Sequence, residues 1–217
     1  MFVLANAGLV LGSRGLLDAY ERASTTEIAN DSLREMRPDI VHQCLLAIFD
    51  SEIAFQGRAK VFIETTRGKT IMVNPRLRPP RTYVRFKGLM EMLFRDGKIT
   101  SENGEVLLSF LRGSVAPVIP YGAEVIGLCN ERTAPVKRPI DIAEQCIKNP
   151  VPDSLQGGQK RCYAFFVVGC NDDASTIGIP LISQTVCLSP YPTTPHVLLS
   201  RMCEAFQDGF KKVKEQE

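Results

Sequence analysis

The chain has 217 residues, which suit one α/β domain or a domain with one elaboration, so no second domain is required. Its 26 Lys plus Arg against 24 Asp plus Glu leave a near-neutral balance, and net charge alone therefore cannot support a polyanionic partner. Seven cysteines without C-x-x-C spacing and only two histidines exclude a zinc site and a disulfide framework as the simplest interpretations. We expect reduced, intracellular thiols and no metal.

The first 74 residues predict a strand, a helix and a β-hairpin in that order. The apolar start "MFVLANAGLVLG" lacks the positive charge of a secretory leader and predicts a buried first strand. The spacing of apolar residues in 31–54 is typical of an amphipathic helix with Pro38 near its first turn, so Arg37 and Asp39 should lie at the helix entrance. Alternation in 61–74 around "TRGK" predicts a hairpin.

The next segment, "NPRLRPPRTYVRF" from Asn74 to Phe86, concentrates positive charge on stiffened backbone. We expect Arg81 to begin a helix, which would place it one turn from Arg85 on the same face. Guanidinium groups match phosphates and stack on bases, and Tyr83 would add a stacking surface. A solvated face, with arginines paired to carboxylates and covering the apolar helix, is the alternative that the pattern leaves open.

The helix expected after this segment has an apolar stripe, with Thr82 as its cap and Gly97 at its end. Further on, "AEVIGLC", "CYAFFVVG" and "TVCLS" are typical of buried strands. Two helices are expected, one at "DIAEQCIKN" and a terminal one with Thr194 as its cap and Pro195 at its first position. Alternating strands and helices predict a mostly parallel sheet. Ligands in such sheets bind at the carboxyl ends of strands, here Leu128-Cys129, Gly169-Cys170 and Leu188-Ser189.

Two single residues and one helix face each have a structural interpretation as well as a functional one. Asp50 follows a helix, where a cap or loop-bracing carboxylate is favoured over chemistry. His42 lies inside that helix, where a hydrogen-bonded structural histidine is favoured over a general base. The apolar residues of the last helix, Met202, Ala205 and Phe206, are candidates for packing against a second subunit as well as their own core.

Four blocks, "RPDIVHQCLLAIFDS", "NPRLRPPRTYVRFKGLM", "FFVVG" and "LSPYP", resemble those of the pseudouridine N1-methyltransferases of the SPOUT superfamily, which act in ribosome biogenesis. The resemblance is close over roughly residues 36 to 94 and rests on strand order and short motifs over 115 to 217. It implies one SPOUT-type methyltransferase domain over 1–217: an α/β fold with a mostly parallel sheet flanked by helices, a C-terminal trefoil knot, and a β-hairpin with an arginine-rich RNA-binding elaboration at about 55–88.

The resemblance also implies S-adenosyl-L-methionine as cofactor, small-subunit ribosomal RNA as partner, and a homodimer. Pre-ribosomal assembly factors are further possible partners, and no membrane is implied. The implied location is the nucleolus in a eukaryote and the cytoplasm in an archaeon.

Carried across by position, the family's functional residues fall into two sets. The RNA-binding set is Arg37, Asp39, Arg78, Arg81 and Arg85, in which Asp39 steadies Arg37; Arg76 lies outside the family pattern. The cofactor-binding set is Leu128, Gly169, Ala174, Leu188, Ser189, Pro190, Tyr191, Pro192 and Thr193. No catalytic base is identified, and solvent or a backbone acceptor is possible.

The function implied is methylation of N1 of a pseudouridine in small-subunit ribosomal RNA, with the enzyme aligning two bound partners. Three departures concern cofactor affinity: "GSVAP" at Gly113 to Pro117 lacks the family's Asn and Asp, and Ala174 and Cys187 replace glycines. They keep open an alternative, a non-catalytic RNA-binding ribosome-assembly factor with a degenerate cofactor pocket. A dinucleotide oxidoreductase is disfavoured because no G-x-G-x-x-G follows a strand.

Overall fold

The structure is a computed structural model that describes residues 1–21, 34–119, 123–149, 151–152, 160–161, 165–176 and 178–214. Residues 162–164, which the sequence placed in a strand, lie outside the described residues. Among the described residues, no helix is both long enough and apolar enough to cross a membrane.

Eight strands form one sheet with parallel pairing in one half and antiparallel pairing in the other. Four of its pairings are parallel and three are antiparallel. The parallel half is, in spatial order, β12 (Gln184–Val186), β8 (Val125–Leu128), β11 (Phe165–Gly169), β1 (Phe2–Ala7) and β4 (Val61–Thr65). The antiparallel half continues from β4 with β5 (Thr70–Val73), β7 (Val106–Leu111) and β6 (Lys98–Thr100). The expected α/β fold with a mostly parallel sheet flanked by helices is confirmed.

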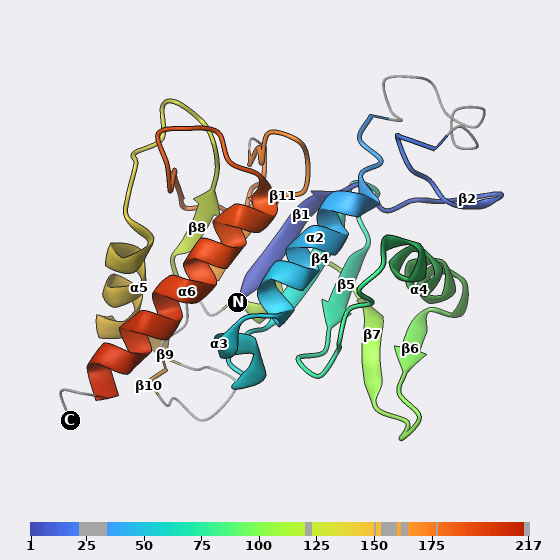
Figure 1. The fold of residues 1–217 in the computed structure, drawn as a ribbon, viewed down its shortest axis with the longest axis horizontal. Helices are drawn as coiled ribbons and strands as arrows, with labels where there is room; N and C mark the ends of the chain where they lie inside the picture. Colours follow the sequence, from blue (N-terminus) through green and yellow to red (C-terminus); the bar gives the residue numbers. More distant parts are fainter. Residues whose placement is uncertain are drawn as a thin grey trace.

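The long helices lie along the sheet in the order α5, α6, α2 and α4 (Figure 1). Their bounds are α2 (Pro38–Phe49), α4 (Tyr83–Asp96), α5 (Pro139–Lys148) and α6 (Pro195–Lys214). The short elements are α3 (Glu52–Phe55), the 3₁₀ turn η2 (Ala116–Val118), the strand pair β2 (Leu11–Gly12) and β3 (Gly15–Leu16), and the pair β9 (Val151–Pro152) and β10 (Lys160–Arg161). Three of the long helices begin with a proline: α2 with Pro38, α5 with Pro139 and α6 with Pro195. The sequence indicated a proline at the start of α2 and of α6.

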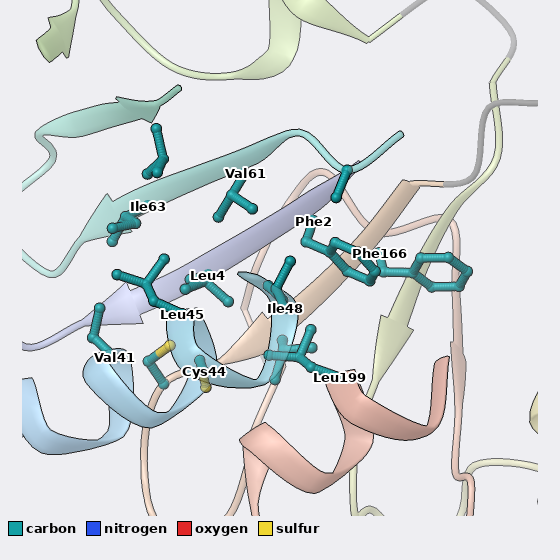
Figure 2. Packing of buried hydrophobic residues seen from close by; sticks show 14 of the residues in the cluster. Phe2, Leu4, Val41, Cys44, Leu45, Ile48, Val61, Ile63, Phe166 and Leu199 are labelled. Carbon is teal, nitrogen blue, oxygen red and sulfur yellow. The ribbon is translucent and has the colours of Figure 1, made fainter. Parts of the chain in front are cut away.

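Alternate residues of the central strand face different cores, because side chains of a strand point alternately to its two faces. Phe2 and Leu4 of β1 belong to the main core, which the helices cover (Figure 2). Val3 and Ala5 belong to a second cluster, covered by loop residues such as Ile119 and Ile182. The strands β1, β8 and β11 are therefore largely buried on both faces, which explains their nearly continuous apolar sequence.

The structure differs from the sequence-based expectation in three places. Helix α4 begins at Tyr83, after Thr82 at the N-cap position, so Arg81 precedes the helix and the expected one-turn spacing to Arg85 is wrong. Strands β6 and β7, in residues 98–111, extend the sheet and were not predicted from the sequence.

The third difference concerns the last helix. Met202, Ala205 and Phe206 are already buried within this chain, with 0%, 6% and 5% of their surface exposed. Their predicted role against a second subunit is therefore wrong, because packing of α6 on the sheet and on α2 and α5 uses that face.

Candidate functional site

The carboxyl ends of β8, β11 and β12 lie side by side, as expected from parallel pairing. Leu128, the last residue of β8, is in register with Val168 of β11 on one side and Val186 of β12 on the other. The three segments that the sequence predicted as ligand-binding strand ends therefore meet at one edge of the sheet. This edge, at the top in Figure 1, is also where α2 begins.

Asn130, two residues after β8, connects the loops that follow these strands. Its Nδ2 donates hydrogen bonds to the carbonyl oxygens of Asp173, at 3.0 Å, and Thr193, at 2.7 Å. Its Oδ1 accepts from the backbone N–H of Thr193 at 3.0 Å. One amide side chain thus fixes the spacing of all three loops, because it is bound to the other two.

A cleft of about 430 Å³ opens between these loops, and we call it the strand-end cleft. Asn130 and Glu131 line it from the loop after β8, Asp172, Asp173 and Ser175 from the loop after β11, and Pro192 to Thr194 from the loop after β12. Of the predicted cofactor set, Pro192 and Thr193 are in this lining. Apart from Pro192, the residues that line the cleft have polar or acidic side chains, so it suits a ligand with hydroxyl groups and positive charge.

The other predicted cofactor positions do not line the cleft. Leu128, Ala174 and Leu188 have side chains in the core, exposed by 0%, 0% and 3%. Ser189 accepts the backbone N–H of Tyr191 through Oγ at 3.1 Å, and the Tyr191 side chain is 76% exposed. Buried positions of this kind can offer a ligand backbone groups rather than side chains.

Two residues of the loop after β11 have backbone requirements that the sequence suggested only in part. A Cβ at Gly169 would lie 1.9 Å from the carbonyl oxygen of Ser175, so no larger residue fits without moving the loop. Ala174 has φ of 50°, in the left-handed region that glycine occupies at little cost. The backbone here retains the conformation that a glycine would favour, although this chain carries alanine.

The remaining departures from the family pattern are also accommodated. Sγ of Cys187 lies 3.1 Å from the carbonyl oxygen of Glu131, to which it donates, and 4.0 Å from Sγ of Cys129. Burial raises the pKa of the Cys129 thiol to about 11, so this thiol is neutral at pH 7. In "GSVAP", the backbone N–H of Val115 donates to Oε1 of Glu64 at 3.1 Å, so a carboxylate from β4 holds this segment.

Arg37, at the N-cap position of α2, is held by two carboxylates. Its Nε and Nη2 donate to the two oxygens of Asp39 at 2.9 and 2.8 Å, a bidentate pair through which Asp39 steadies Arg37 as expected. Its Nη1 donates to Oδ1 of Asp172, a residue of the strand-end cleft. Its guanidinium carbon lies 4.9 Å from the centre of the Tyr20 ring. The hydrogen bonds that Arg37 donates to Asp39 are the main cause that raises the pKa of Arg37 above its ordinary value.

The other predicted RNA-binding arginines lie in residues 74–86, which we call the arginine segment and which runs into the start of α4. Nη1 of Arg81 donates to Asp50 at 2.5 Å, and both side chains are largely exposed. Arg78 lies over the ring of Phe55, 5.0 Å from its centre. Arg85 is exposed and makes no ion pair with any residue that the structure describes. Asp50 thus braces the loop, as expected. Arg81 is an exposed arginine paired with a carboxylate, which is the arrangement that the alternative interpretation of this segment described.

His42 and Tyr83 are structural residues in this arrangement. Nε2 of the buried His42 donates to the carbonyl oxygen of Pro80 at 2.7 Å, and its ring stacks on Phe86 at 4.8 Å. The structural interpretation of His42 is therefore confirmed. Tyr83 is half-buried and its hydroxyl donates to Asp18; burial, with help from that carboxylate, raises the pKa of Tyr83. The ring of Tyr83 packs beside that of His42, and its role as a stacking surface for a base stays a prediction.

Sequence reasoning missed Asn130 and Asp172. Asn130 directly follows the predicted strand end Leu128-Cys129, and a short polar residue at that place was the available signal. Asp172 gave no such signal, since its partner Arg37 is 135 residues away in the sequence. Among the described residues, no group of three or more His, Cys, Asp and Glu side chains could hold a metal ion.

Comparison with known proteins gives the same picture from sequence and from structure. A family model described as "EMG1/NEP1 methyltransferase" matches residues 2–207. The "Ribosomal RNA small subunit methyltransferase NEP1" of Candida albicans is 32% identical over 94% of this chain and 72% of that protein. The Drosophila melanogaster protein of the same name is 38% identical over 79% of this chain and 65% of that protein. The Schizosaccharomyces pombe relative "mra1" is 29% identical, and the matched part is 50% of its length.

Among solved structures, Archaeoglobus fulgidus Nep1 bound to S-adenosylhomocysteine superimposes with a TM-score of 0.73 at 22% identity. The superposition covers 97% of this chain and 98% of that one. At this identity the likeness establishes a shared fold.

Proposed function

Because the chain belongs to the EMG1/NEP1 methyltransferase family, we propose that it transfers a methyl group from S-adenosylmethionine to N1 of a pseudouridine in small-subunit ribosomal RNA. The observation that carries the proposal is the ion pair of Arg37 with Asp172. Arg37 belongs to the arginines expected to bind RNA, and Asp172 lines the strand-end cleft. The arginine expected to bind RNA is therefore in contact with the cleft proposed for the cofactor, which supports a reaction that has to align two bound partners.

The residues of the strand-end cleft fit the proposed cofactor. S-adenosylmethionine carries a positive sulfonium and an ammonium group, which the carboxylates of Glu131, Asp172 and Asp173 would attract. Its ribose hydroxyls and adenine edge would bind the polar side chains and backbone groups of the loops that Asn130 connects. When bound, the cofactor supplies the electrophilic methyl group.

The contribution of this chain to the reaction is mainly alignment. Arg37, Arg78, Arg81 and Arg85 would bind the phosphates of an unpaired loop, so that the target base is held against the strand-end cleft. The N1 proton has to leave before or during attack, and solvent or a backbone carbonyl would accept it. His42 is committed to Pro80 and does not serve as the base.

Several finer features belong to the same proposal. The segment from β8 to α6 would contain a trefoil knot, and the chain would form one domain in which the β4–β5 hairpin carries the arginine segment as an elaboration. The protein would act as a homodimer on ribosomal RNA, together with pre-ribosomal assembly factors. Its location would be the nucleolus in a eukaryote and the cytoplasm in an archaeon.

The second candidate function is a non-catalytic assembly factor that binds RNA without a cofactor. Ala174, with its buried methyl group in a left-handed conformation, favours this candidate, because it replaces a glycine of the family's cofactor loop. Against it, the loop geometry is retained: Ala174 is tolerated in that conformation, and Asn130 still joins the three loops.

Calorimetric titration with S-adenosylhomocysteine, followed by transfer of labelled methyl groups to an RNA stem-loop, separates the two candidates. We expect micromolar cofactor binding and methylation of a loop that contains pseudouridine, with none on the same loop containing uridine. Uridine is the matched control because its N1 is occupied by the glycosidic bond. RNA binding without cofactor binding would establish the assembly factor instead, and failure to bind either would reject both candidates.

A further inference from the structure

Arg37 is held by carboxylates from two very different places in the chain. Asp39 lies two residues further along, in the first turn of α2. Asp172 lies in the loop after β11, 135 residues away, and lines the strand-end cleft. The second ion pair therefore joins the entrance of α2 to a loop of the proposed cofactor site.

The two carboxylates differ in how firmly they are held. The Arg37 side chain is only 11% exposed and that of Asp39 is 25% exposed, while Asp172 is 70% exposed. Asp39 accepts hydrogen bonds from two nitrogens of the guanidinium group, whereas Asp172 accepts a single hydrogen bond, from Nη1. The pairing of an exposed, singly bonded carboxylate contributes little, because water competes for the carboxylate oxygens. Asp172 is consequently the exchangeable partner of Arg37.

A phosphate oxygen would use the same donor as Asp172. Guanidinium groups bind carboxylates and phosphates through the same N–H groups and in the same planar geometry. Since Nε and Nη2 are bound to Asp39, Nη1 is the amine that an RNA phosphate would bind at lowest cost. Asp172 and a phosphate cannot both occupy that position.

We propose that Asp172 is a positioning residue that occupies Nη1 of Arg37 in the absence of RNA and is displaced from it by an RNA phosphate. The inference rests on the proposed function, because it takes Arg37 as an RNA-binding residue. Its consequence is that RNA binding at Arg37 frees one anchor of the loop after β11, the loop whose Asp173 and Ser175 line the strand-end cleft.

Asp173 provides a closely matched control. It is next in sequence, exposed, and lines the same cleft. Its side chain makes no ion pair within the part of the chain that the structure describes, and only its carbonyl oxygen is bound, by Asn130. Loss of a negative charge at either position changes long-range repulsion of RNA by similar amounts. Only Asp172→Asn also removes the competitor for Arg37.

The experiment compares RNA affinity of wild type, Asp172→Asn and Asp173→Asn by fluorescence anisotropy at low salt, with the pseudouridine stem-loop as probe. We expect Asp172→Asn to bind RNA about three- to tenfold more tightly than Asp173→Asn, the scale of one weak ion pair. In an Arg37→Gln background, the difference between the two aspartate variants should disappear. Equal RNA affinities of the two single variants would overturn the proposal, as would a difference that persists without Arg37.

Two measurements keep the outcome interpretable. Thermal melting identifies an Arg37→Gln protein that does not fold, in which case the two single variants decide the question. Wild-type binding of the stem-loop and of S-adenosylhomocysteine tests the proposed function separately. If wild type binds both ligands and the aspartate variants behave alike, only the role of Asp172 is wrong; if wild type binds neither, the proposed function fails first.

Discussion

Asn130 and Thr193 are joined by reciprocal hydrogen bonds: the Asn130 amide donates to the Thr193 carbonyl oxygen at 2.7 Å and accepts from the Thr193 N–H at 3.0 Å. The two residues are 63 positions apart and belong to the loops after β8 and β12. An asparagine side chain here imitates a backbone partner, and both backbone groups of Thr193 are satisfied by it.

We predict that Asn130→Ala weakens cofactor binding about tenfold or more, because the backbone groups of Thr193 and the Asp173 carbonyl lose their partner and the loops lose their spacing. RNA affinity should remain close to that of wild type. Calorimetry with S-adenosylhomocysteine measures the first effect and anisotropy the second. Asn149→Ala is the matched control, since Asn149 is exposed at the end of α5 and does not line the strand-end cleft. Equal cofactor affinity in the two variants would refute the role of Asn130.

Gly169→Ala should displace the loop after β11, because the added Cβ would meet the Ser175 carbonyl oxygen at 1.9 Å. We expect a loss of about 1–3 kcal/mol in the free energy of unfolding, the usual cost of overpacking, together with weaker cofactor binding. Urea denaturation measures the stability. Gly88→Ala serves as the control: a Cβ there meets nothing within 4 Å, and alanine favours the helix α4 by up to about 1 kcal/mol. A Gly169→Ala protein as stable as wild type would contradict the close contact.

Arg85→Ala should weaken RNA binding and reduce the slope of log affinity against log salt by about 1, as expected for the loss of one phosphate contact. Cofactor affinity should be unaffected. Arg76→Ala is the control variant, because Arg76 is equally part of the arginine segment but is paired with Glu105 at 3.2 Å and lies outside the family pattern. Anisotropy over a series of salt concentrations gives both slopes. Equal reductions of the slope in the two variants would contradict the prediction, because they would mean that RNA binding depends on the total charge of this segment and not on the position of Arg85.

Stability should fall as the pH rises from about 9 to about 11. Burial raises the pKa of Cys203 from its ordinary value of 9.0 to about 11, so between these values the unfolded thiol loses its proton while the folded thiol keeps it. The stabilisation is complete below the unfolded pKa and is lost as the pH passes through the folded one. Each pKa unit corresponds to about 1.4 kcal/mol.

Urea denaturation of wild type and Cys203→Ala at several pH values isolates this contribution, because all other titrating groups are shared. The variant should show the smaller fall in the free energy of unfolding over this range, whatever its stability at pH 8. Parallel pH profiles for the two proteins would show that Cys203 does not titrate as described.

Local signals in the sequence indicated the four long helices and the buried character of the strands that were predicted. Pro38 stands at the start of α2 and Gly97 ends α4 in the left-handed conformation, since both residues restrict or permit backbone angles wherever they occur. Continuous apolar runs indicated β8 and β11, because burial on both faces leaves no polar alternation. The Asp39 pairing with Arg37 was also predictable, as the two residues are two positions apart.

Contacts between distant segments were decided by the tertiary structure. Arg37 meets Asp172, and Asn130 meets Thr193, only because parallel pairing brings the loops after β8, β11 and β12 to the edge where α2 begins. The burial of Met202 and the extension of the sheet by β6 and β7 likewise depend on which elements pack together. Sequence by itself determined backbone preferences and a family pattern of arginines. The neighbours of each side chain follow from the fold, since no local pattern records a partner that is 63 or 135 residues away.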